Sequence, residues 1–230
     1  MVAIARKQIK GKSVMTELYL VRHAQTAGNQ QRAFQGLTDA DLSAEGEKQL
    51  ERLAERFADV AIDRIYTSPL IRARKTAETV NRHHGTEITV EPALVEIDAG
   101  DLEGMPFSEV FAKYPEEIGR FMNVPELFAM PGGESMAQVY ERMTTAVATI
   151  VQQNRGKRIA VVSHGCALQN YLAFALGYGQ KGIAKAPICY NTAVTHIRYT
   201  NSGLPFVVYL NDASHLGAEM LEHSKWELKP

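Results

Sequence analysis

Short apolar runs alternate with helical segments along this chain. This alternation restricts the possible folds more than any other feature of the sequence. The runs 17–22 (ELYLVR), 64–67 (RIYT) and 158–165 (RIAVVSHG) are apolar and end in polar residues, which is typical of buried strands. Helical periodicity recurs between them. Strands separated by helices predict an α/β fold, here a three-layer α/β/α sandwich with a mostly parallel sheet and helices on both faces.

The predicted helices carry start signals in the sequence. Ser43 is expected to cap the first long helix, and Ser135 opens a capping box for a later one. Ser68-Pro69 is expected to open a helix that runs to about residues 84–85, with the serine at the cap and the proline in the first turn.

One domain is predicted over residues 15–230, preceded by a flexible extension over residues 1–14. A small helical lid insertion is expected at about residues 105–134, where prolines interrupt short apolar segments. Two further strands, 192–200 and 205–212, flank a turn and predict a hairpin.

Composition narrows the classes of function. The formal net charge of −1 gives no reason to expect a nucleic-acid partner. Cys166 and Cys189 are too few for a disulfide framework, which favours a reducing compartment. No apolar run approaches the ~20 residues that span a bilayer, so no membrane partner is expected. The predicted location is the cytoplasm, and a homodimer is compatible with these features.

Charged and imidazole side chains stand where two predicted strands end. Arg22 and His23 follow the first strand, and His164 follows the strand 158–163. In parallel sheets the carboxyl ends of neighbouring strands meet at one edge, where ligands bind. Arg72 lies about one turn into the helix that Ser68 opens, and its planar guanidinium suits phosphate oxygens. An oxyanion site is therefore predicted at this edge.

Such a site suits phosphoryl transfer. Neutral imidazole is a competent covalent nucleophile, so His23 is the predicted attacking group. The leaving oxygen needs a proton, and Glu96 is the preferred donor. Asp98, Asp101 and Glu103 lie in the same acidic loop and compete with Glu96 for this role.

Five motifs in one order resemble those of the histidine phosphatase superfamily, also called phosphoglycerate-mutase-like. They are LVRHAQT (20–26), SPLIRARKTAE (68–78), EIDAGDLEG (96–104), PGGES (131–135) and VVSHG (161–165). The resemblance covers about residues 17–212, nearly the whole chain, and five motifs in order are far more specific than any one of them.

The resemblance implies roles for individual residues. His23 matches the phosphorylated nucleophile and Glu96 the general acid/base, while Arg22, Arg72 and His164 match the rest of the phosphate pocket. The residues expected beside the substrate are Asn29, Gln35, Gly36 and Gly165. The implied partner is a small phosphorylated substrate, and neither a metal nor an organic cofactor is implied.

The phosphatase branch of this superfamily is favoured over the mutase branch. A cofactor-dependent phosphoglycerate mutase would need a second phosphate site in a lid rich in Arg and Lys. Between residues 105 and 131 the only cations are Lys113 and Arg120. The predicted activity is therefore a phosphomonoester phosphatase, with the mutase as an alternative.

A non-catalytic module and a serine hydrolase also remain open at this point. Ala24 stands where the superfamily usually has glycine, adds a methyl group and loses positive-φ freedom, which keeps open a non-catalytic phosphate-binding module. Residues 161–165 resemble a nucleophile elbow without its first glycine. Ser163, Asp212 and His215 occur in the order of a hydrolase triad, which keeps open a serine hydrolase.

Overall fold

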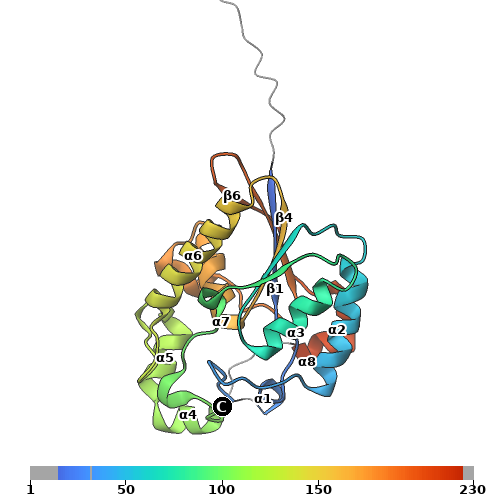
Figure 1. Ribbon diagram of the computed structural model, residues 1–230. Coiled ribbons are helices and arrows are strands. Elements are labelled where there is room, and N and C mark those ends of the chain that lie inside the picture. Colours follow the sequence, from blue (N-terminus) through green and yellow to red (C-terminus); the bar gives the residue numbers. More distant parts are fainter. Residues whose placement is uncertain (1–14, 32, 225–230) are drawn as a thin grey trace, which may run out of the picture.

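The structure is a computed structural model that describes residues 15–31 and 33–224 (Figure 1). Among these residues six strands form one sheet in the order β3-β2-β4-β1-β5-β6. They are β1 (Thr16–Arg22), β2 (Arg64–Thr67), β3 (Ile88–Val90), β4 (Arg158–Ser163), β5 (Val194–Tyr199) and β6 (Pro205–Asp212). β3, β2, β4 and β1 are parallel, while β5 and β6 are antiparallel and form the predicted hairpin. The mostly parallel sheet is confirmed, and the predicted extension lies outside the described residues.

Helices cover both faces of this sheet (Figure 1). The helices around the sheet include α2 (Ala44–Phe57), α3 (Ile71–Val80), α6 (Met136–Gln153), α7 (Gly165–Ala175) and α8 (Gly217–Ser224). Alternate residues of β1 face opposite sides, because side chains alternate along a strand. Leu18 and Leu20 belong to the core under α6 and α7, and Tyr19 and Val21 to the core under α2 and α3. The three-layer α/β/α sandwich is confirmed.

Two of the predicted helix starts are found in place. The Ser43 hydroxyl accepts a hydrogen bond from the backbone N–H of Gly46 at the start of α2 (3.0 Å). Ser135 and Gln138 form the expected capping box at the start of α6. These side chains satisfy N–H groups that have no partner within the helix.

The predicted start of α3 is wrong by two residues. The helix begins at Ile71 rather than at Pro69 and ends at Val80, and Ser68 does not cap it. Its first N–H, that of Ile71, donates instead to the carboxylate of Asp39 (2.6 Å), which arrives from another loop. The Ser68 hydroxyl accepts from the backbone N–H of Leu70 (3.3 Å), which precedes the helix, and from the His164 ring (2.6 Å), so it reaches no N–H of α3 itself.

The predicted lid contains two short helices, α4 (Phe107–Lys113) and α5 (Pro115–Asn123), which Tyr114 separates. Its aromatic residues are mostly core. Phe121 packs edge-to-face on Phe34 and on Phe128, at 6.1 and 5.1 Å between ring centres. Phe128 is only 1% exposed and belongs to the core that includes β1 and α6. The insertion is therefore packed into the main core of the domain.

No helix among the described residues is both long enough and apolar enough to cross a bilayer.

Because Phe128 fills the core beneath the insertion, Phe128→Ala is expected to lower the free energy of unfolding by about 3–5 kcal/mol. The matched control is its neighbour Leu127, which is 70% exposed. Leu127→Ala is expected to change the stability by less than about 0.5 kcal/mol. Urea unfolding of the two variants measures both effects, and equal midpoints would contradict this placement of the insertion.

Candidate active site

Two parallel neighbours bring the two predicted histidines together. β1 and β4 pair with Arg22 opposite Ser163, and the backbone N–H of His23 donates to the carbonyl of Ser163 (3.0 Å). His164 follows directly, and the centres of the His23 and His164 rings lie 5.1 Å apart. The prediction that both imidazoles share one edge of the sheet is confirmed.

A cavity of about 510 Å³, its open mouth included, lies at this edge. The predicted site residues that line it are Arg22, His23, Asn29, Gln35, Gly36, Glu96 and Gly165. Much of the remaining wall is apolar, with Phe34, Phe107 and Met130 among its side chains. Arg72 and His164 are not among the lining residues, since both are almost fully buried, but the His164 ring lies beside that of His23.

The hydrogen bond of His23 determines which ring nitrogen can react. Its Nδ1 lies 2.7 Å from the carbonyl oxygen of Ala24. A carbonyl oxygen only accepts, so Nδ1 carries the proton and Nε2 keeps its lone pair. Burial, followed by the guanidiniums of Arg72 and Arg22, holds the pKa of His23 well below its usual value. The imidazole is therefore neutral and nucleophilic at physiological pH.

Arg22 offers an unpaired donor beside this imidazole. The side chain is 3% exposed, and its Nη1 donates to the carbonyl of Cys189 (2.5 Å). Its Nε is buried and has no hydrogen-bond partner among the described residues. A buried donor without an acceptor costs about 1–3 kcal/mol. An oxyanion in the cavity would supply the missing acceptor.

Arg72, His164 and Ser68 form a chain of hydrogen bonds beside His23. The Nε of Arg72 donates to Nδ1 of His164 (3.3 Å), which makes Nδ1 the acceptor and leaves the proton on Nε2. That Nε2 donates to the hydroxyl of Ser68 (2.6 Å). Burial and the Arg72 charge hold the pKa of His164 well below its usual value. The other two nitrogens of Arg72 donate to the carbonyls of Thr38 (2.6 Å) and Gly36 (2.8 Å).

Glu96 lies at the start of α7, with its carboxylate on the helix N–H groups. Oε1 accepts from the backbone of Ile97 and of Ala167 (2.9 Å each), and Oε2 accepts from Cys166 (3.0 Å). These three bonds hold the group in place at the cavity wall and leave Oε2, which accepts only one of them, with a free lone pair that can carry a proton.

The three other acids of this loop, which compete with Glu96 for the role of proton donor, do not line the cavity. Asp101 is exposed, and Asp98 accepts a hydrogen bond from the backbone of Gly100 (3.0 Å). Glu103 binds the backbone of residues 36–38. None of the three lines the cavity, which favours Glu96 as the proton donor.

Asn29 and Gln35 are positioned through one threonine. Asn29 accepts from the backbone N–H of Thr26 (3.1 Å) in the capping box of α1 (Ala27–Gln30). Gln35 accepts from the hydroxyl of Thr26 (2.6 Å). A side chain at Gly28 would collide with Gln35, with a Cβ at 1.9 Å from its Nε2. Only glycine lets Gln35 lie across α1 at the mouth of the cavity.

Ala24 fits its position without strain. It is fully buried in the core under α2 and α3, and its backbone N–H donates to the hydroxyl of Thr76 (3.0 Å). Among the described non-glycine residues only Thr192 and Asn211 have positive φ, so Ala24 does not need the freedom of glycine. Alanine in place of the usual glycine therefore gives no structural reason to expect a non-catalytic module.

The structure adds two residues that the sequence did not single out for the site. Ser68 accepts the hydrogen bond of His164, and its place after β2 at the same sheet edge was the available signal. Asn191 donates to the carbonyl of His23 (2.9 Å). Asn191 lies in a loop far along the chain from His23, and no sequence pattern predicts this contact.

The candidate serine triad is not assembled. The hydroxyl of Ser163 is fully buried and donates to the carbonyl of Leu94 (2.7 Å). His215 instead contacts Thr192 and Arg56, at 3.1 Å each. No hydrogen bond joins Ser163 to His215, so the geometry does not support a serine hydrolase.

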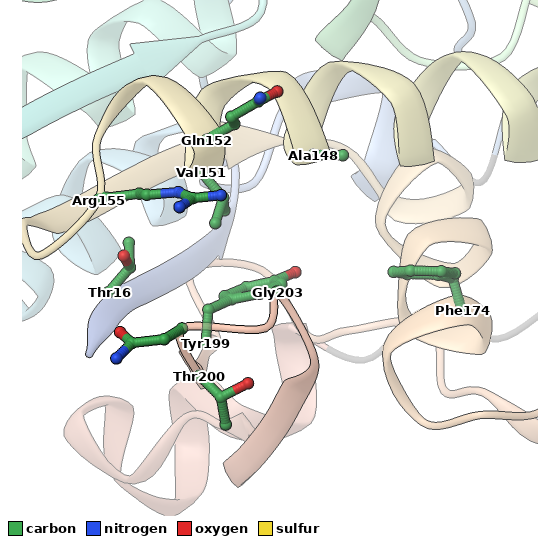
Figure 2. A pocket seen from close by; sticks show the side chains of 10 residues that line it. Thr16, Ala148, Val151, Gln152, Arg155, Phe174, Tyr199, Thr200 and Gly203 are labelled. Atoms are coloured by element: carbon green, nitrogen blue, oxygen red, sulfur yellow. The ribbon is translucent and has the colours of Figure 1, made fainter. Parts of the chain in front are cut away.

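A second cavity opens at the opposite edge of the sheet, between α6 and the β5–β6 hairpin (Figure 2). Its wall includes Val151, Phe174 and Tyr199, and Arg155 is the only charged side chain in it. It holds no pair of groups suited to acid, base or nucleophilic chemistry. No group of three or more metal-ligating side chains occurs in the described part of the chain either.

Known proteins place the chain in a family. The sequence model of the histidine phosphatase superfamily (branch 1) matches residues 18–213. The chain belongs to this superfamily, as its five motifs predict. Phosphoserine phosphatase 1 of Hydrogenobacter thermophilus is 36% identical over 163 residues, which cover 71% of this chain and 77% of that protein. Probable phosphoglycerate mutase GpmB of Escherichia fergusonii is 32% identical over 212 residues, covering 90% and 98%.

Solved structures agree with this assignment. Bacillus stearothermophilus YhfR superposes with a TM-score of 0.82 at 34% identity, covering 87% of this chain and 98% of that one. Phosphoserine phosphatase from Entamoeba histolytica, in complex with 3-phosphoglyceric acid, gives a TM-score of 0.75 at 27% identity, with the same coverage. The relatives are phosphatases and mutase-like proteins, so the coarse activity of this chain is that of a phosphatase or mutase.

The neutral histidines make stability depend on pH. In the unfolded chain a histidine takes up a proton near pH 6.5, whereas His23 and His164 stay neutral in the folded state. The unfolded state therefore binds more protons as the pH falls from about 7 to about 5.5. The free energy of unfolding is expected to fall by up to about 1.4 kcal/mol per pH unit for each of the two.

Thermal or urea unfolding across this range of pH measures the slope. His164→Gln is expected to reduce the slope by close to one proton. His83→Gln is the control, since the His83 side chain is exposed and meets water in both states. A slope that is the same in the wild type and in His164→Gln would contradict a neutral, buried His164.

Proposed function

We propose that the protein is a phosphomonoester phosphatase that acts through a covalent phosphohistidine intermediate on His23. The observation that carries this proposal is a pair of residues that line one cavity: His23, with a neutral imidazole and a free Nε2, and Arg22, whose buried Nε has no hydrogen-bond partner among the described residues. A nucleophile and a donor for an oxyanion are the parts that phosphoryl transfer requires.

In the first step the lone pair of His23 Nε2 attacks the phosphorus atom. The N–P bond forms as the bond to the leaving oxygen breaks, and that oxygen takes the proton of the Glu96 carboxyl. Arg22 and Arg72 oppose the charge on the transferring phosphoryl oxygens. The Nδ1–H of His23 stays on the carbonyl of Ala24, which stabilises the positive ring of the intermediate.

In the second step water attacks the phosphorus atom of the phosphohistidine. The Glu96 carboxylate accepts a proton from that water, the N–P bond breaks, and its electron pair returns to Nε2. Inorganic phosphate and neutral His23 are the products. The enzyme is then restored, with the proton back on Glu96.

Hydrolysis is favoured over phosphate migration by the surroundings of the cavity. Lys113 pairs with Glu109 and Arg120 with Glu116, and both lysine and arginine are about half exposed. Neither cation lines the cavity, so the insertion offers no second phosphate site there. The apolar wall around Phe107 suits an apolar or amphipathic leaving group on a small substrate.

His23→Ala is expected to abolish turnover, because no other side chain of the cavity is a neutral imidazole with a free lone pair. The wild type, mixed briefly with a radiolabelled phosphomonoester and quenched, is expected to carry a base-stable, acid-labile label on His23. A fully active His23→Ala protein would reject the proposal. A wild type that binds phosphate without any turnover would favour the non-catalytic module.

Glu96→Gln is expected to reduce kcat/KM by about 10²–10⁴, the usual contribution of general acid–base catalysis. The amide keeps the size of the side chain but cannot donate and regain the carboxyl proton. Asp98→Asn is the control from the same loop and is expected to keep most of the activity. Phosphate release and phosphate migration are measured on a panel that includes phosphoglycerates, sugar phosphates and nucleotides. Migration without release would favour the mutase instead.

A further inference from the structure

Glu103 binds a loop of the active site through the backbone alone. Its Oε1 accepts from the N–H of Gly36 (3.0 Å) and of Thr38 (3.1 Å), and its Oε2 accepts from Leu37 (3.0 Å). Three consecutive amides therefore surround one carboxylate. Among the described residues these amides are the hydrogen-bond partners of Glu103, whose charge also acts on Arg72 without a direct bond and opposes the lowering of the Arg72 pKa by burial.

The same loop holds Arg72 from its other side. The carbonyl of Gly36 accepts from Nη2 of Arg72 (2.8 Å), and the carbonyl of Thr38 accepts from Nη1 (2.6 Å). Each of these two residues thus donates its N–H to Glu103 and accepts from Arg72 with its C=O. The backbone of residues 36–38 therefore connects the Glu103 carboxylate to the Arg72 guanidinium.

Arg72 has little freedom within this arrangement. Its Nε donates to His164, so three of its five N–H groups are used, and two remain for a ligand. The loop has equally little room. A Cβ at Gly36 would lie 2.4 Å from the carbonyl oxygen of Ile97 and 2.7 Å from the Glu103 carboxylate. The direction in which the remaining N–H groups of Arg72 point depends on where the loop is held.

We propose that Glu103 is a positioning residue for oxyanion binding, which acts through residues 36–38 to aim Arg72 at the phosphate. The inference rests on the proposed function, because Arg72 matters only if the cavity takes a phosphoryl group. Glu103 touches neither the substrate nor the reacting atoms. Its charge is needed because a neutral side chain cannot accept from three amides at once.

Glu103→Gln tests this role. The substituted amide has the size of the carboxylate, but its NH₂ group faces backbone N–H groups and repels the loop. Inorganic phosphate is the probe, and its affinity is measured directly by ³¹P NMR titration and as a competitive inhibitor. Phosphate binding is expected to weaken about tenfold, the scale of losing hydrogen bonds to a charged group. Unchanged phosphate affinity would overturn the proposal.

Glu91→Gln is the matched control. Glu91 also accepts a backbone N–H, that of Ala93 (3.1 Å), but its loop does not reach Arg72. Its substitution is expected to leave phosphate affinity within about twofold. An equal loss of affinity in Glu91→Gln and Glu103→Gln would mean that any loop carboxylate has this effect, which contradicts the proposal.

A double-mutant cycle with Arg72→Lys separates positioning from general stability. Lysine cannot form both hydrogen bonds that the Arg72 guanidinium makes to the loop. In the Arg72→Lys variant, Glu103 therefore no longer positions the side chain at residue 72 through the loop. Glu103→Gln is therefore expected to weaken phosphate binding less than about twofold in Arg72→Lys. A full tenfold loss there would show that Glu103 acts by another route and would overturn the proposal.

A second variant and the wild-type measurements separate a failure of this inference from a failure of the proposed function. If Glu103→Gln does not fold, Glu103→Asp is measured, since its shorter arm keeps the charge but cannot reach all three amides. Unchanged phosphate affinity in Glu103→Asp then overturns the inference. A wild type that binds phosphate but lacks turnover rejects the proposed function alone, whereas a wild type that binds no phosphate rejects both.

Discussion

The parallel pairing of β1 with β4 is the interaction on which the rest of the site depends. It sets Arg22 opposite Ser163, so that His23 and His164 follow at the same edge, although they lie far apart along the chain. A shift of one residue in this register would turn one imidazole to the other face of the sheet, because side chains alternate along a strand. The buried alternation of both strands, which serves two separate cores, prevents such a shift.

The charges around the cavity are arranged in favour of an anion. Arg22 and Arg72 are almost fully buried, and the hydrogen bonds they make within the protein go to backbone carbonyls and to one imidazole rather than to carboxylates. Their hydrogen-bond partners are thus neutral groups, while the negative charge of Glu96 acts on both of them without a hydrogen bond. Burial, together with the positive charge of the two arginines, holds the pKa of His23 and of His164 well below the usual value, so neutral imidazoles and cations lie close together. A phosphate dianion is the ligand that this imbalance suits.

Sequence patterns located the ends of the strands and most of the candidate residues, because those depend on short-range order. Arg22 and His23 end an apolar run, and the capping signals of Ser43 and Ser135 act within three residues. The failure at Ser68 has a tertiary cause, since its hydroxyl goes to His164 and α3 starts later. Asn191 stayed undetected for the same reason: its partner, the carbonyl of His23, is adjacent only in space.

The amino-acid sequence by itself determined the α/β class, the edge of the sheet at which the candidate site lies and the family motifs, since all of these follow from the spacing of residues along the chain. Tertiary structure alone decided which nitrogen of His23 is free, that Arg72 is held by a loop tied to Glu103, and that the insertion is core. Each of these depends on hydrogen bonds or burial between segments that the sequence order keeps apart. Their geometry exists only once the whole core has packed.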